Sequence, residues 1–173
     1  MVLREGGQVN FGKRQVTIHP CVGYYSCEGI PVRHSVIVVS DDSKHDYHSV
    51  EHYLNLAYNS FSSENRKFEK VVVFSDGCSS QYKGKGTFAD LSLSHVPGLE
   101  RHYFGIEHGK GDGEIGILNR ALDRAIASNA VITNAEDTYT YCVKNLVLNE
   151  PTSKRTFLCG RFHNNGYHYL PKQ

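Results

Sequence analysis

The clearest regularity in the chain is an alternation of apolar and polar residues in its first quarter. Val16, Ile18 and Val22 alternate with polar neighbours after residue 14, and a second apolar stretch occupies residues 32–40. The intervening residues, SCEGIP, have the composition of a turn. This pattern predicts an antiparallel hairpin.

Beyond residue 49 the apolar period becomes that of a helix. The positions that follow the i, i+3, i+4 spacing are Val50, Tyr53, Leu54, Ala57, Tyr58 and Phe61. The run VVVFS at residues 71–75 is continuously apolar, which is typical of a central strand covered on both faces. A short helix is expected over 87–94 and a strand over 101–107.

The remaining elements are read in the same way. Residues 113–128 place Ile115, Leu118 and Leu122 on one face of an amphipathic helix. Asn134 can cap a further helix over 135–148, and a last strand is expected over 154–162.

Strand, strand, helix, strand, short helix, strand, helix is the order of an α/β protein. It is also the order of a ribonuclease-H-like mixed sheet flanked by helices, with the first strand of that fold removed. At 173 residues the chain is expected to form one domain. We expect its core over about 15–130 and a C-terminal extension of helix and strand over 131–173.

Composition excludes some classes of protein. The chain has 19 Lys and Arg against 18 Asp and Glu, so a nucleic-acid partner would have to be met by a local basic patch. Its five cysteines lack Cys-x-x-Cys spacing, which argues against a disulfide framework and a zinc ribbon. No segment has the apolar length of a signal peptide core or a membrane span, so an intracellular protein without membrane association is expected.

Carboxylates at two places could carry chemistry. Asp76 directly follows the strand over 71–75, and Asp112 and Glu114 lie where the helix over 113–128 begins. Acids that converge at strand ends can hold two cations roughly 4 Å apart across a phosphodiester. Each group also has a simpler interpretation, since Asp-Gly is common in turns and acids favour helix N-termini.

A group of basic residues suggests that the chain binds nucleic acid. Lys83, Lys85 and Lys110, with His108 nearby, could hold a nucleic-acid backbone, and Tyr82 could stack on a base. An ordinary solvated surface explains the lysines equally well.

A histidine group offers a third kind of site. His45, His48 and His52 have a spacing that can bind zinc, although a polar helix face explains them better. Asp41 or Asp42 is expected to cap the same helix.

The motifs SDGCSSQYKGKG and HYFGIEHGKGDGEIG resemble those of transposon-derived proteins of animal genomes that are related to DDE-type transposases. QVTIHP, SDD followed by HD, FSDG with SQYK, and HGKG followed by DG occur in the order of that family, from residue 15 to about 145. The resemblance implies a ribonuclease-H-like core. Asp76 matches the second acidic ligand of that family, Asp112 is the third, and Glu114 is the alternative third.

One departure concerns the first acid. The family carries an Asp-Phe strand motif before the segment that matches KRQVTIHP, whereas only MVLREGGQVNFG precedes it here. Glu5 lies in a stretch that looks too weak for a central strand. Asp41 and Asp42 cannot substitute, because the strand that ends there is expected at the sheet edge, three strand spacings or roughly 14 Å from Asp76.

The resemblance therefore implies a nuclear, DNA-acting domain with Mg²⁺ or Mn²⁺ as the ancestral cofactor. We expect strand cleavage and transfer to be weak or absent. The alternative is a non-enzymatic module that binds nucleic acid or protein through Tyr82, Lys83, Lys85 and Lys110. A missing first strand would also leave a sheet edge open to a second copy or a partner chain, unless the N-terminal residues or rearranged local pairing cover it.

Overall fold

A computed structural model describes most of the chain. The described residues are all except 6–7, 12–13, 43–45, 64–65, 76–81, 95, 97, 104–110, 164–165 and 170–173. Within residues 2–15 and 161–169 only the backbone is described. The described chain is a mixed α/β structure with one sheet and four helices. None of the described helices is both long enough and apolar enough to span a membrane.

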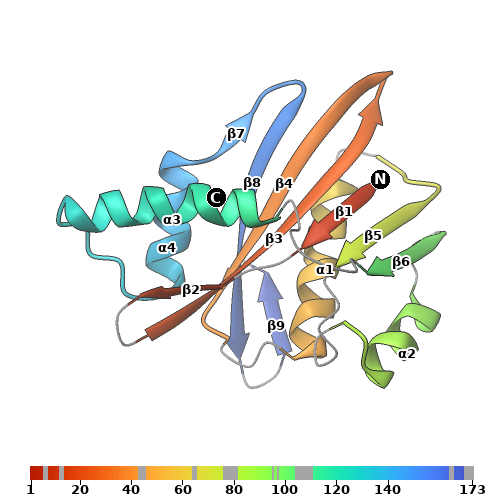
Figure 1. Cartoon of the computed structure of the whole chain (residues 1–173), viewed down its shortest axis with the longest axis horizontal. Coiled ribbons are helices and arrows are strands. Elements are labelled where there is room, and N and C mark those ends of the chain that lie inside the picture. The colour runs from red at the N-terminus through yellow and green to blue at the C-terminus, as the bar shows by residue number, and fades with distance from the viewer. Residues whose placement is uncertain are drawn as a thin grey trace.

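The elements follow one another along the chain with short connections (Figure 1). In order they are β1 (Val2–Glu5), β2 (Gln8–Phe11), β3 (Arg14–Cys27), β4 (Ile30–Ser40), α1 (Tyr47–Phe61), β5 (Val71–Ser75), α2 (Lys85–Leu93), β6 (Leu99–Tyr103), α3 (Gly111–Ala127), α4 (Ala135–Asn145), β7 (Leu148–Asn149), β8 (Ser153–His163) and β9 (Gly166–Tyr169).

All described strands belong to one sheet, whose main path is β6-β5-β1-β3-β4-β8-β7. β1 runs antiparallel to β3 and parallel to β5, and β5 runs parallel to β6. β3 and β4 form a long antiparallel hairpin, and β8 is added parallel to β4. β2 and β9 pair with β3 and β8 outside the main path.

The position of β1 corrects the expectation that the first strand is missing. Residues 2–5 lie between β3 and β5, with Leu3 opposite Gly23 on one side and Val73 on the other. Four residues that include an arginine and a glutamate form a weak strand by propensity. They are held because β3 and β5 would otherwise each present a row of unpaired backbone groups. The edge expected there is therefore closed.

The hairpin and the helix that follows it confirm their predictions. The turn between β3 and β4 is formed by Glu28 and Gly29, whose φ angles are both positive, at 51° and 80°. Two positive φ values are the geometry of the tight turns that suit twisted antiparallel strands. α1 then buries the apolar face that its spacing predicts.

Two predictions about strand position need correction. β5 is an interior strand, but only Val71, Val73 and Ser75 are buried, while Val72 and Phe74 on its other face are partly exposed. β4 was expected at the sheet edge, and it is instead covered by β8 and β7. The C-terminal extension thus continues the same sheet.

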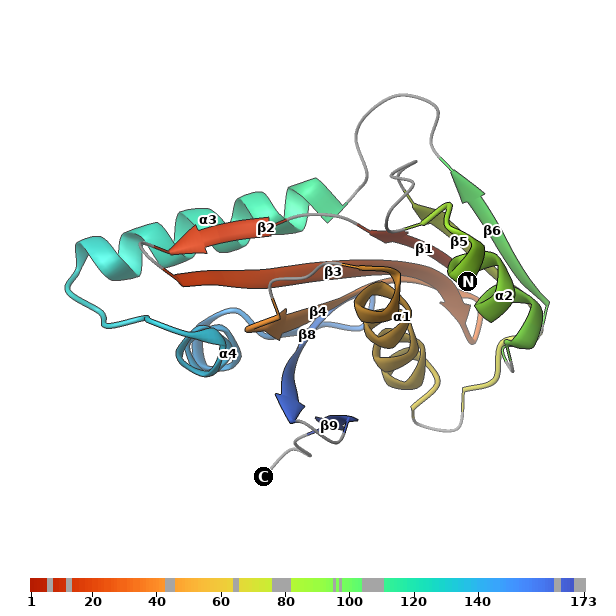
Figure 2. The same ribbon diagram turned by 90° about the horizontal axis from the view of Figure 1, so that it is seen from below.

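The helices cover opposite faces of the sheet. α1 packs on one face with a core that includes Val36, Phe61 and Leu158. α3 and α4 pack on the other face with a core that includes Ile37, Leu122 and Phe157. Figure 2 shows α1 and α4 on either side of β4 and β8.

The close approach of α1 to β3 can be tested at Gly23. A Cβ atom there would lie 2.9 Å from Cε1 of Phe61, a side chain with no exposed surface. Because a buried aromatic ring has little room to move, we expect Gly23→Ala to destabilise the fold by about 1–3 kcal/mol. Urea unfolding would measure this change.

Gly113→Ala is the matched control, because a Cβ atom at Gly113 meets nothing within 4 Å. It lies in α3, where alanine is favoured over glycine by about 1 kcal/mol. Equal unfolding free energies for the two variants would contradict the packing described here.

Candidate functional site

The ends of two strands and the start of one helix lie close together in the structure. β1 and β5 are adjacent and parallel, with Arg4 opposite Phe74, so their C-terminal ends lie side by side. Glu5 is the last residue of β1, and Ser75 is the last residue of β5. Both views place the N-terminal end of α3 next to these strand ends (Figures 1 and 2). This junction is the candidate site.

Some of the predicted site residues lie outside the described residues. Asp76, His108 and Lys110 are in this group, and Asp76 directly follows the described end of β5. Asp112 is described and lies exposed in the first turn of α3. The junction therefore brings the start of α3 to the end of the strand that precedes Asp76.

Glu114 has a different role from the metal ligand that was considered. Its side chain has no exposed surface, and its two carboxylate oxygens bind two arginines. One oxygen accepts a hydrogen bond from Arg33 of β4, and the other accepts from Nε of Arg155 of β8 at 2.8 Å. A carboxylate that is enclosed by two guanidinium groups is not open to a metal ion. Its assignment as an alternative third acid was wrong.

The charge of Glu114 is stabilised by these partners. Burial alone would raise the pKa of Glu114, but the hydrogen bonds and positive charges of Arg155 and Arg33 outweigh burial and lower it below 4.5. The carboxylate is therefore ionised at neutral pH. It fixes the first turn of α3 to two neighbouring strands of the sheet.

Tyr82 was expected to stack on a nucleic-acid base, and the structure contradicts this. Its side chain is 2% exposed and belongs to the core on the α1 side of the sheet. Its carbonyl oxygen accepts a hydrogen bond of 2.7 Å from the hydroxyl of Tyr103. Tyr82 therefore anchors the segment before α2 instead of offering a stacking surface.

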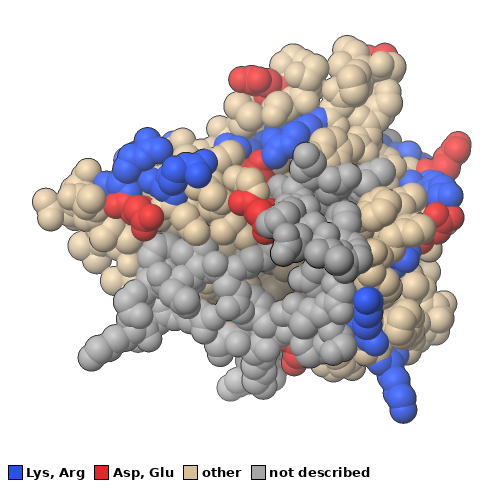
Figure 3. Space-filling model, viewed as in Figure 1, with Lys and Arg blue, Asp and Glu red and all other residues tan. Residues whose placement is uncertain are grey.

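The two described lysines of the same segment are exposed, as a binding surface requires. Nζ of Lys83 lies 5.0 Å from the ring centre of Tyr103, and Lys85 is the first residue of α2. Figure 3 shows basic side chains at the end of the molecule that carries α2. The same view shows basic and acidic side chains mixed over α3, so that helix is not a uniform basic surface.

Asp41 and Asp42 follow β4, which is separated from β5 by β3 and β1. Neither can share a metal ion with a residue after β5. Neither caps α1 as expected, because the N-cap is Asp46, which accepts from the backbone N–H of Ser49 at 3.0 Å. Asp41 instead accepts from the backbone N–H of Ala135 in α4 at 2.9 Å, and Asp42 accepts from the Ser49 hydroxyl.

The histidine group is only partly described. His45 lies outside the described residues, His48 is exposed, and His52 is half-buried. Burial lowers the pKa of His52 to about 4, so this residue is neutral at pH 7. Within the described part of the chain, no cluster of three or more His, Cys, Asp or Glu residues could hold a metal ion.

The arginines that hold acidic side chains were missed by sequence reasoning. Besides Arg33 and Arg155, Arg101 of β6 lies 2.7 Å from the carboxylate of Glu51 in α1, and its side chain is 2% exposed. Burial raises the pKa of Glu51, and the charge of Arg101 opposes this rise. For Arg33, the position beside the apolar stretch of β4 was a signal in the sequence, because an arginine that is buried there needs a partner.

The contribution of Glu114 to stability should depend on pH. The pKa of Glu114 in the folded protein is below its value of about 4.5 in the unfolded chain. Its contribution to the free energy of unfolding is therefore complete above pH 4.5 and is lost as the pH falls through the pKa of the folded protein. Glu114→Gln removes the negative charge that neutralises Arg33 and Arg155. We expect a loss of about 3 kcal/mol at pH 7, which shrinks as the wild-type carboxylate is protonated.

Urea unfolding of both forms between pH 7 and pH 3 would measure this difference. Asp123→Asn, an exposed position on the same helix, is the matched control and should follow the wild type. A difference between Glu114→Gln and wild type that stays constant down to pH 3 would contradict the ionised arrangement.

Comparisons with known proteins give one relationship. No curated protein and no solved structure gives a significant match to the chain. One family model matches residues 4–153, which include the junction of β1, β5 and α3. The chain belongs to the family described as Domain of unknown function (DUF8701).

Proposed function

We propose that this chain is a ribonuclease-H-like domain of DDE-transposase ancestry, whose ancestral reaction is the metal-dependent cleavage and transfer of DNA strands. The position of β1 is the observation that supports this best. The elements expected from the sequence have the order of a ribonuclease-H-like fold without its first strand. Residues 2–5 supply a strand between β3 and β5. Acids of this fold must converge at strand ends, and here two such ends adjoin the start of α3.

The first acid in this proposal is Glu5. It was set aside because its segment looked too weak for a central strand, and that reason no longer holds. Glu5 and Ser75 each follow the paired residues Arg4 and Phe74 on adjacent strands. Neighbouring strands lie about 4.8 Å apart, so the ends of β1 and β5 are within the span of two shared metal ions, and Asp76 follows the last residue of β5 in the sequence.

The second and third acids are Asp76 and Asp112. Carboxylate oxygens are hard ligands that suit Mg²⁺ or Mn²⁺, which would supply an activated water or 3′-hydroxyl for attack on phosphorus. Glu114 takes no part in this set, because its oxygens are bound to Arg33 and Arg155. Its role is to hold the helix turn that carries Asp112.

Weak activity follows from the nature of the first acid. Glutamate is one methylene longer than the aspartate in the family motif, which shifts its carboxylate relative to the backbone. A misplacement of about 1 Å in a catalytic group can reduce the rate roughly 10²-fold. We therefore propose that cleavage in this chain is slow but retained, and that the chain binds DNA in the nucleus.

DNA contact in this proposal depends on lysines rather than on stacking. Lys83 is exposed just before α2, Lys85 is exposed as the first residue of α2, and Lys110 precedes α3 in the sequence. These positions flank the junction in the chain. Ammonium groups there would contact backbone phosphates and would not select a base sequence.

Cleavage can be tested with supercoiled plasmid DNA in the presence of Mn²⁺ or Mg²⁺. We expect slow nicking that depends on the metal, and we expect Asp76→Asn to reduce its rate at least about 10²-fold. Glu5→Asp would restore the length of the family residue and should raise the rate if Glu5 is the first acid. Gel separation of nicked and supercoiled plasmid gives the rate.

Asp90→Asn, an acid of α2, is the control and should leave nicking unchanged. Metal-dependent nicking that persists in both Glu5→Gln and Asp76→Asn would refute the proposed acids. DNA binding without nicking by any form would support the alternative of a non-enzymatic binding module.

Salt dependence tests the lysines separately from catalysis. Each lysine that contacts a phosphate contributes about one unit to the slope of log Kd against log salt concentration. We expect the double variant Lys83→Gln, Lys85→Gln to lower the slope by about two units. Fluorescence anisotropy with a labelled duplex would measure it, and Lys67→Gln with Lys144→Gln is the charge-matched control. An equal change in both double variants would argue against a specific surface.

A further inference from the structure

Two aromatic rings are stacked on the face of the sheet opposite α1. Phe74 of β5 and His102 of β6 are paired in register, with 5.1 Å between ring centroids and 23° between ring planes. Val71 and Val73 of β5 pack in the core on the α1 side, so Phe74 lies on the other face. The distance and tilt are those of a favourable aromatic stack.

This face of β5 and β6 is not covered by a described helix. α3 and α4 pack over β3, β4 and β8. Figure 1, in which α3 lies in front of the sheet, shows no helix in front of β5 and β6. Phe74 is partly exposed, and the side chain of His102 is 52% exposed. The stack is therefore accessible from this side of the molecule.

His102 presents part of its ring to solvent in a defined orientation. Phe74 stacks on one face of the imidazole, and β6 is the last strand at this end of the described sheet path. The exposed half of His102 therefore includes the ring face that is turned away from β5. Oε2 of Glu100 lies 3.6 Å from Nε2 of the ring. With two neighbours holding it, the imidazole can accept a third ring at little cost in side-chain entropy.

The charges around His102 allow a nucleic-acid strand to approach. Glu100 is paired with Lys70, whose Nζ lies 2.7 Å from Oε1. Lys83, which is proposed above to contact phosphate, has its Nζ 5.0 Å from the ring centre of Tyr103, the residue after His102. Successive side chains of a strand point to opposite faces, so the lysine and the imidazole lie on either side of the end of β6.

The kind of base that fits this stack follows from its size. One exposed ring face can hold one flat heterocycle. Bases in a duplex already have their faces stacked on neighbouring bases, so only an unpaired base can stack on a protein ring without further cost. Such a contact tolerates any sequence, because every base has a π-face.

We propose that the Phe74–His102 stack binds one unpaired base of the DNA strand, which lies against the outer face of His102 while lysines contact the phosphates. The proposal rests on the DNA-acting function proposed above and names its substrate as DNA with unpaired nucleotides.

Fluorescence anisotropy with labelled oligonucleotides tests the proposal, with EDTA present so that no cleavage occurs. We expect the wild type to bind a single strand at least about fivefold more tightly than a duplex of the same sequence. His102→Ala should weaken single-strand binding at least about fivefold and leave duplex binding unchanged. His102→Tyr keeps a stacking ring and should bind the single strand as tightly as the wild type.

An oligonucleotide that contains only abasic sites separates the base from the phosphates. It retains every phosphate, so His102→Ala and the wild type should bind it equally. His48→Ala is the matched control, because His48 is also an exposed histidine stacked on an aromatic ring, that of Tyr47 at 3.7 Å between centroids. It lies on α1, on the other side of the sheet, and its variant should bind the single strand as the wild type does.

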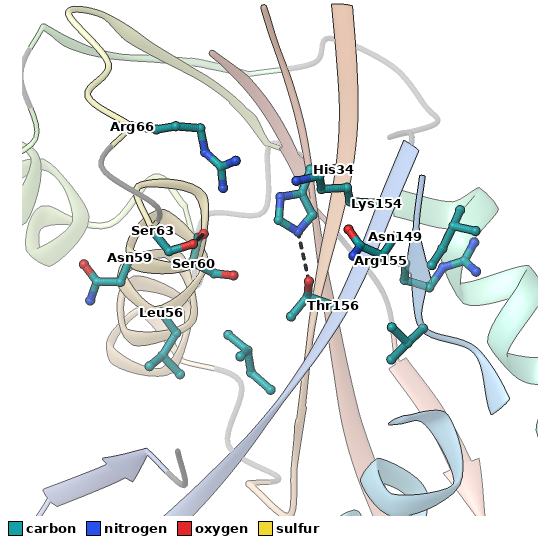
Figure 4. Close-up of a pocket in the computed structure, with 13 residues that line it drawn as sticks. His34, Leu56, Asn59, Ser60, Ser63, Arg66, Asn149, Lys154, Arg155 and Thr156 are labelled. Atoms are coloured by element: carbon teal, nitrogen blue, oxygen red, sulfur yellow. Dashed lines mark hydrogen bonds between the residues drawn. The ribbon is translucent and has the colours of Figure 1, made fainter. Parts of the chain in front are cut away.

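A different place that could accept a base is a cavity of about 790 Å³ beside His34, between α1, β7 and β8 (Figure 4). Asn59 and Asn149 line it, and their amides can form hydrogen bonds with a base. The cavity lies on the α1 side of the sheet, so Asn149→Ala tests it independently of His102. Weaker single-strand binding by Asn149→Ala, with none by His102→Ala, would overturn the proposal.

Three further results would also overturn it. These are equal affinity for single strand and duplex, an equal effect of His102→Ala on the abasic strand, and self-association that His102→Ala abolishes without a change in oligonucleotide binding. The last result would assign the stack to a second copy of the chain. Plasmid nicking is measured separately: its absence, together with the expected effect of His102→Ala, would refute only the catalytic proposal.

Discussion

Four residues join the two parts of this sheet. β5 and β6 form one part and β3, β4, β8 and β7 form the other, and in the described main path only β1 lies between them. Backbone hydrogen bonds on both sides of Val2–Glu5 are therefore the interaction on which the single sheet depends. Without them, β3 and β5 would each carry an unpaired edge, and α1 would cover two separate surfaces. The end of β1 also carries Glu5, the first acid of the proposed set.

A second constraint determines where α3 begins. Glu114 is buried between Arg33 and Arg155, so the first turn of α3 must lie over β4 and β8. The cost of burying this carboxylate is offset by two charge-assisted contacts. The apolar face of α3 then packs with α4 on the same side of the sheet. A charged group that looked catalytic is thus the residue that positions the helix carrying Asp112.

Periodicity predicted the local elements because one face of each is buried. The hairpin, α1, α3 and α4 with its Asn134 cap were all expected from spacing, and the structure confirms them. β1 was missed because its stability comes from two partners distant in sequence rather than from its own residues. β9 was missed for a similar reason, since it is a short strand that depends on pairing with β8.

The candidate site was harder to predict than the fold. Tyr82 and Glu114 have residue types that suit binding and catalysis, and only burial shows that they serve packing and ion pairing. The partners of Glu114 are 81 and 41 residues away in the chain, so no local pattern could reveal them. The cavity beside His34 was also invisible, because its walls come from α1, β7 and β8.

The β3–β4 hairpin has a consequence for the order of folding. Its strands are consecutive and joined by a two-residue turn, so its formation requires little loop-closure entropy and is expected on the microsecond timescale. Pairing of β1 with β5 must instead bring together residues about 70 positions apart, such as Val2 and Val72. The hairpin is therefore expected to form first, and β1 can then pair with β3 while the other edge of β1 waits for β5. During synthesis, that interval is when a chaperone would be most useful.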